Sequence, residues 1–181
     1  MNEPIIDVSE AVNKTDEIFE KNKKSITYVF GAAVAIAAAV FFYNQYVTIP
    51  KEAEAKDAIW KAELNLQKDS LNLALNGRGL TEMGLNDIIT DYGSTETGNL
   101  AHYYAAVAEL KSGNHEAALD HIGSFSTNEP VLNILASGLK GDAHSEMKDY
   151  DTAAKHYRSA FNGKANALTT PYFGVKLGLV L

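Results

Sequence analysis

The sequence predicts an all-α protein with a single N-terminal transmembrane helix followed by an α-solenoid of helical hairpins. Residues 25–47 form one long apolar stretch, and apolar residues after it recur at the spacing of helices. The second half of the chain also repeats itself with a period of 35 residues. No strand-like alternation of apolar and polar residues occurs along the chain.

The apolar stretch runs from Ser25 to Val47, and no charged residue occurs between Ser25 and Pro50. A helix over residues 25–47 is about 35 Å long, enough to cross a hydrocarbon core of about 30 Å. A cleaved signal peptide is the alternative, but the stretch is longer than a signal's apolar core and no A-x-A site closes it. We therefore expect an uncleaved anchor, with Pro50 ending the helix.

The composition is that of a folded protein without a basic surface. The chain has 181 residues, of which 46% are hydrophobic, and a net charge of -7. These values argue against disorder and against a nucleic-acid partner. Because the chain has no cysteine, disulfides, thiolate nucleophiles and cysteine-ligated metals are excluded.

The charges that flank the apolar stretch predict its orientation. Lys21, Lys23 and Lys24 stand directly before it, whereas only Lys51 lies equally close on the far side. By the positive-inside rule the N-terminal head is cytoplasmic and the C-terminal domain lies on the opposite side of the membrane. We interpret the three lysines as a topology signal, because lipid-specific recognition usually takes about four to eight basic residues.

Small residues mark one side of the predicted anchor. Gly31 and Ala35 are four residues apart, so they share a face on which another membrane helix could approach closely. Small residues are also common in membrane helices that act only as anchors. Packing against a partner helix and simple anchoring are both left open.

Three shorter helices are expected between the anchor and the repeats. The first covers residues 51–67, with Trp60 as a packing residue, and the second covers residues 71–76. The run Gly77-Arg78-Gly79 then forms a turn rather than a phosphate-binding loop, because no strand precedes it. The third helix covers residues 85–92.

The repeat with a period of 35 predicts two helical hairpins. Small and aromatic residues recur at this separation, as expected where two helices cross. The aligned pairs are Ala106 and Gly141, Ala108 and Ala143, Ala118 and Ala153, Ile122 and Tyr157, and Phe125 and Ala160. This pattern resembles the tetratricopeptide repeat (TPR), whose length is about 34 residues.

The chain is accordingly divided into six parts. The expected domains are a cytoplasmic head (1–24), a transmembrane helix (25–47), an atypical helical repeat (48–97), two TPR-like repeats (98–130 and 131–169) and the start of a further, apparently truncated repeat (170–181).

The layout of head, anchor and repeats resembles the YfgM-like membrane-anchored tetratricopeptide proteins of Gram-negative bacteria, particularly the form found in Bacteroidota. The stretches of residues 69–77 and 91–101 carry the resemblance most specifically. It implies an ancillary subunit of the Sec translocon, with SecYEG and a PpiD-like periplasmic chaperone as partners. The alternative is a scaffold of another envelope assembly, such as outer-membrane protein biogenesis.

The histidines do not predict an enzyme. His115 and His121 are six residues apart, about 240° around a helix, and so cannot meet at one metal ion. His102, His144 and His156 stand alone in the sequence. We expect no catalytic residue, metal, cofactor or small-molecule substrate.

The repeat alignment predicts a protein-binding groove on the concave side of the two hairpins. Its residues are Tyr103, Val107, Leu110 and Lys111 in the first, and Gly138, Asp142, Ser145 and Glu146 in the second. Val107 and Leu110 could instead belong to the core. The mixed apolar and acidic character favours a short apolar or amphipathic segment of another envelope protein, with basic residues near Asp142 and Glu146.

Overall fold

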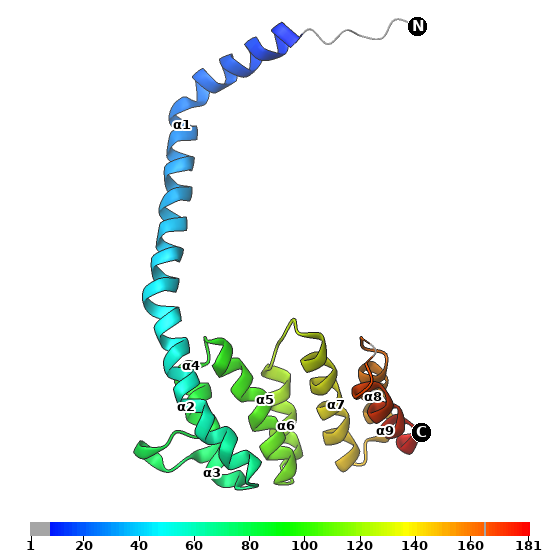
Figure 1. Cartoon of the computed structure of the whole chain (residues 1–181). Helices are drawn as coiled ribbons and strands as arrows, with labels where there is room; N and C mark the ends of the chain where they lie inside the picture. Colours follow the sequence, from blue (N-terminus) through cyan, green and yellow to red (C-terminus); the bar gives the residue numbers. More distant parts are fainter. Residues whose placement is uncertain (1–7, 165) are drawn as a thin grey trace, which may run out of the picture. The chain divides into compact units, whose positions relative to one another are not determined.

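The computed structural model describes the backbone of residues 8–164 and 166–181, and the side chains of residues 22–164 and 166–181 except that of Leu80. Every regular element within these ranges is a helix, which confirms the all-α prediction (Figure 1). The chain divides into two compact units, Met1–Ile49 and Pro50–Leu181.

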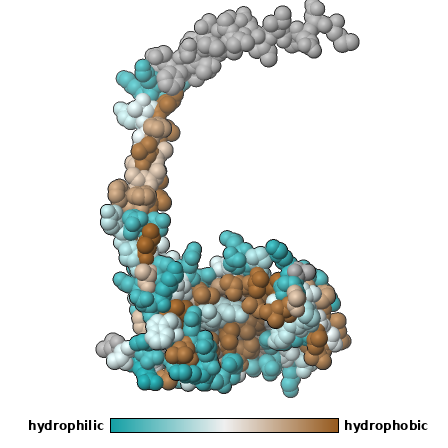
Figure 2. All heavy atoms as spheres, in the orientation of Figure 1, coloured by the Kyte–Doolittle hydropathy of each residue, from teal (hydrophilic) through white to brown (hydrophobic). Residues whose placement is uncertain are grey.

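The first unit contains one long helix, α1 (Val8–Tyr43), and a π-helical turn, η1 (Asn44–Thr48). Large apolar side chains along it, from Ile26 to Tyr46, are exposed (Figure 2). The helix over Asn22–Gln67 is the one described helix that is long and apolar enough to cross a membrane. The predicted apolar N-terminal helix is therefore confirmed.

The helix does not end at Pro50, contrary to our expectation, because α2 (Ile49–Gln67) includes this residue. Proline has no N–H and its ring crowds the carbonyl four residues back, so an ordinary α-helix is disturbed here. In η1 the Ile49 N–H donates to the carbonyl of Asn44, five residues back. This wider turn directly before Pro50 lets the backbone remain helical.

The second unit consists of successive short helices (Figure 1). After α2 they are α3 (Leu71–Asn76), the 3-10 turn η2 (Gly79–Thr81), α4 (Leu85–Tyr92), α5 (Glu96–Lys111), α6 (His115–Ser124), α7 (Pro130–Glu146), α8 (Tyr150–Phe161) and α9 (Thr169–Val180). Helix α5 packs against α6, α7 against α8, and α8 against α9. Helices α5 and α7 are also in contact.

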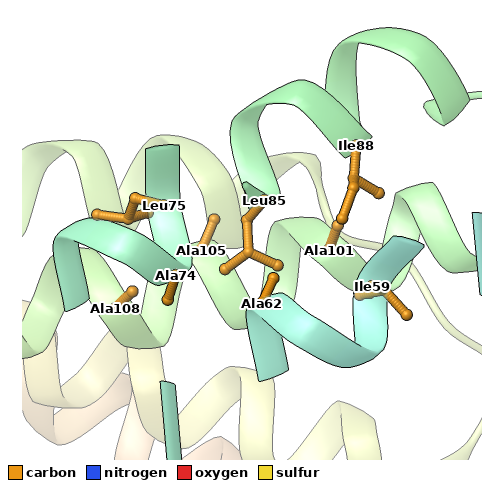
Figure 3. Packing of buried hydrophobic residues seen from close by; sticks show 9 residues of the cluster. All are labelled: Ile59, Ala62, Ala74, Leu75, Leu85, Ile88, Ala101, Ala105 and Ala108. Carbon is orange, nitrogen blue, oxygen red and sulfur yellow. The ribbon is translucent and has the colours of Figure 1, made fainter. Parts of the chain in front are cut away.

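The core at the start of this unit is built from α2 to α5 (Figure 3). Leu85 and Ile88 of α4 are fully buried against small residues such as Ala101 of α5. On α2, Ile59 and Ala62 are buried, but Trp60, the predicted packing residue, is 53% exposed. One residue after Ile59, it lies about 100° around the helix from the buried stripe.

The residues aligned by the 35-residue period are all buried. Ala106, Ile122 and Phe125 form one cluster with Ala136 of α7. The members on α8 form another with Ile134 and Phe173. Gly141 is required where it stands, because a Cβ atom there would lie 2.6 Å from ring atoms of Tyr157. The close approach of α7 and α8 at this point therefore depends on glycine.

Candidate functional site

The groove residues predicted on α5 lie along one half-buried side of that helix. Tyr103, Val107 and Leu110 are each intermediate in exposure. The ring of Tyr103 contacts that of Phe125, with 5.5 Å between the ring centroids. Lys111 is exposed, and its Nζ lies 2.7 Å from Asp69 Oδ1. Tyr103 thus packs partly into the core while it borders solvent.

The residues predicted on α7 differ in what they offer to a ligand. Gly138 is buried, because the Phe173 ring of α9 occupies the space where a side chain would be. Asp142 and Ser145 are half-buried, and Glu146 is exposed. Within the described residues Glu146 makes no ion pair, so it is the acidic group of this side that is open to a basic partner.

Asp142 is instead the centre of contacts within the chain. Its Oδ1 accepts hydrogen bonds from Tyr157 Oη at 2.7 Å and from Lys176 Nζ at 2.6 Å. The Lys176 ammonium also lies 4.8 Å from the centroid of the Tyr172 ring. These contacts connect α7, α8 and α9 at one half-buried carboxylate.

The electrostatics of this centre favour protonated tyrosine and lysine. Burial, and then the hydrogen bond to Asp142, raise the pKa of Tyr157 well above its usual range. Burial alone would lower the pKa of Lys176, but its hydrogen bonds to Asp142 and Tyr172 outweigh this and the pKa is raised. The charge of Asp142 is thereby balanced inside the protein.

The structure brings the two halves of the predicted groove together at Tyr103 and Asp142. Burial raises the pKa of Tyr103, and the nearby charge of Asp142 raises it further. The two residues come from neighbouring helices, α5 and α7. We call the surface of Tyr103, Val107, Asp142, Ser145 and Glu146 the α5–α7 face.

A separate hollow of about 470 Å³ lies where α5 and α7 begin. Leu100, Phe125 and Leu132 are apolar residues of its lining, and Glu96 and Glu129 supply carboxylates. Asn99 fixes the loop at its edge, because its side-chain amide both donates to and accepts from the backbone of Ser126. None of the predicted groove residues lines this hollow.

The histidines are not isolated in space, although they stand alone in the sequence. His102 of α5 meets His121 of α6, and His144 of α7 stacks on His156 of α8. In the described part of the chain, no three His, Asp or Glu side chains are arranged to hold a metal ion. The pairing was missed because it depends on how antiparallel helices are aligned, which sequence spacing alone does not give.

The residues singled out around the long apolar helix fall in the first unit. A Cβ atom added at Gly31 would meet nothing within 4 Å, and Ala35 is exposed. Lys23 and Lys24 are exposed on α1, whereas the side chain of Lys21 lies outside the described residues. The small-residue face of α1 is therefore open to another helix.

Comparison with protein-family models, curated proteins and solved structures finds no match to this chain.

Proposed function

We propose that this protein is a membrane-anchored protein–protein interaction module. The observation that carries the proposal is the α5–α7 face, where the half-buried ring of Tyr103 lies near Asp142 and the exposed Glu146 completes an acidic end. A protein segment is recognised by such a surface when an apolar side chain packs against the Tyr103 ring and a basic side chain meets the carboxylate of Glu146. No enzymatic activity is proposed.

The helical pairs α5–α6 and α7–α8 are, in this proposal, TPR-like repeats of a short solenoid. The repeated burial at a separation of 35 residues supports it, as does the connection of each pair by a turn of only three residues. In solenoids built from such pairs, the first helices of successive repeats line a continuous concave surface. Helices α5 and α7 are the corresponding helices here.

The anchor is proposed to hold the second unit in the periplasm of a bacterial inner membrane. The basic residues Lys21, Lys23 and Lys24 precede the apolar stretch of α1 and support a cytoplasmic N-terminus. Protease added to osmotically opened cells should remove the second unit. Resistance of that unit until the cells are lysed would mean that the orientation is reversed.

The proposed partners are SecYEG and a PpiD-like periplasmic chaperone, so the protein would be an ancillary subunit of the Sec translocon that assists secreted or envelope proteins. The family resemblance of the sequence supports this choice. The alternative is a structural scaffold of an outer-membrane assembly. The α5–α7 face suits either role, because both need a protein-binding surface.

Affinity purification of the full chain in mild detergent separates the two roles. Enrichment of SecYEG together with a PpiD-like chaperone is the expected result. Enrichment of outer-membrane assembly proteins without translocon subunits would favour the scaffold. A variant with Glu146→Lys reverses the charge of the acidic end and should recover less of a partner that binds there, whereas Lys155→Glu, at an exposed position of α8, should not.

A further inference from the structure

The rings of His102 and His121 are in direct contact. The Nδ1 atoms lie 3.2 Å apart and the ring centroids 5.4 Å apart. Both side chains are half-buried, so bulk water does not separate them. The contact joins α5 to α6.

Two neutral imidazoles at this distance share one hydrogen bond. One ring carries its proton on Nδ1 and donates it, and the other accepts through the lone pair of its own Nδ1. A first additional proton leaves this hydrogen bond in place, because the charged ring can still donate. A second proton turns both Nδ1 atoms into donors, removes the hydrogen bond and places two positive charges side by side.

Among the described residues, no carboxylate acts on the charge of His102. Helix α5 packs against α2, α3, α4, α6 and α7. The carboxylates that reach it from α2 contact other residues, Glu52 at Thr97 and Glu63 at Tyr104, and His121 is the charged group that acts on His102. Burial lowers the pKa of His102, and the proximity of His121 lowers it further. The ring is therefore held neutral where an exposed histidine would begin to be protonated.

The second histidine pair has a different environment. The rings of His144 and His156 stack with centroids 5.4 Å apart, and Asp149 Oδ2 lies 3.3 Å from His144 Nδ1. A protonated His144 therefore has a carboxylate beside it, although Lys140 opposes charge on His156. Of the two pairs, His102 and His121 are therefore the one in which no nearby carboxylate is seen to offset a positive charge on the rings.

We propose that His102 and His121 form an acid-sensitive joint between α5 and α6, which is closed when the rings are neutral and loosened when both are protonated. Tyr103 directly follows His102, and its ring packs on Phe125 at the end of α6. Loosening the joint would therefore also disturb the α5–α7 face. That last consequence rests on the proposed function, whereas the joint itself does not.

The direction of the pH effect follows from proton binding. Below about pH 6.5 an unfolded chain protonates His102, whereas in the folded chain the lowered pKa of this residue opposes proton uptake. The stability contributed by the neutral His102 ring is thus fully present above this pH and is lost as the pH falls through the lowered pKa of His102. Each unit of pKa difference corresponds to about a tenfold change in the unfolding equilibrium constant.

Urea unfolding of the full chain in detergent micelles, followed at pH 7.5 and pH 5.0, tests the joint. The unfolding equilibrium constant should rise more between these pH values in the wild type than in His102→Gln/His121→Gln. His115→Gln on α6, outside the pair, should behave as the wild type. Equal rises in the wild type and the double variant would overturn the proposal.

A second measurement applies even if the double variant does not fold. The ring protons of His102 in the wild-type chain should titrate by NMR below the value of a histidine in an unfolded chain. A midpoint at or above about 6.5 would overturn the proposal, because the ring would then accept a proton without resistance.

Discussion

Gly113 and Lys148 lie 35 residues apart and adopt the same left-handed backbone conformation, with φ values of 83° and 64°. The N–H of each donates to the carbonyl three residues back, at 3.1 Å to Leu110 and 2.9 Å to Ser145. The turn that follows α5 is thus repeated after α7. Only the first copy has glycine at this position, the residue that adopts a left-handed conformation without strain.

We expect Lys148→Gly to stabilise the second unit by about 0.5–1 kcal/mol. A side chain with a Cβ is strained at positive φ by about 1–2 kcal/mol, and the greater freedom of glycine in the unfolded chain offsets part of the gain. The reverse change, Gly113→Ala, should destabilise by about 1 kcal/mol. Urea unfolding measures both, and a loss of stability in Lys148→Gly would show that the conformation at this turn is different.

Gly141→Ala should destabilise the protein by about 1–3 kcal/mol. The added methyl group would lie 2.6 Å from Tyr157 ring atoms, and the buried ring has little room to move. Gly123→Ala is the matched control, because nothing lies within 4 Å of a Cβ there and alanine favours the helix by up to about 1 kcal/mol. Thermal unfolding that ranks the two variants in the opposite order would refute the packing of α7 on α8.

The centre at Asp142 predicts a loss of stability in alkali. The folded state raises the pKa values of Tyr157 and Lys176, so the unfolded chain releases these protons first. Their contribution is fully present below about pH 10 and is lost as the pH rises through the folded values. Tyr157→Phe should make the decline of the urea midpoint between pH 9 and 11 shallower than in the wild type. An unchanged slope would mean that Tyr157 does not take part.

Substitutions on the open small-residue face of α1 should affect the binding of a membrane partner without affecting anchoring of the protein itself. Gly31→Leu or Ala35→Leu should lower the recovery of a co-purified membrane protein while the variant stays in the membrane, because larger side chains prevent close helix approach. Val34→Leu and Val40→Leu serve as controls, since both positions are already large and exposed. Equal recovery from all four variants would indicate that α1 is only an anchor.

Sequence periodicity predicted those parts of the fold that depend on local pattern. The uncharged stretch before Pro50 gave the long apolar helix, and the expected helices over residues 71–76 and 85–92 coincide with α3 and α4. Such segments are predictable because a helix with one buried face shows it in the spacing of apolar residues that are close in sequence. The continuation of the helix through Pro50 was not predictable, since it depends on whether the preceding helical turn can widen to accept proline.

The tertiary contacts could not be predicted in the same way. Lys176 reaches Asp142 from a position 34 residues further along the chain, and no local sequence motif predicts this pair. The meeting of His102 with His121 likewise depends on the alignment of α5 with α6. Asp142 was expected to face a ligand's basic residues, but the folded chain supplies a lysine of its own.

Photo-crosslinking in living cells tests the central claim, that the α5–α7 face binds another protein. A photoreactive residue is placed at Tyr103 or Glu146 on this face, and at the exposed Lys155 of α8 as the matched control. Products at Tyr103 and Glu146, with translocon or PpiD-like proteins, are the predicted result. If neither position gives a crosslinked product and Lys155 gives strong ones, the account is contradicted, because the binding surface would then lie on the other side of the helices.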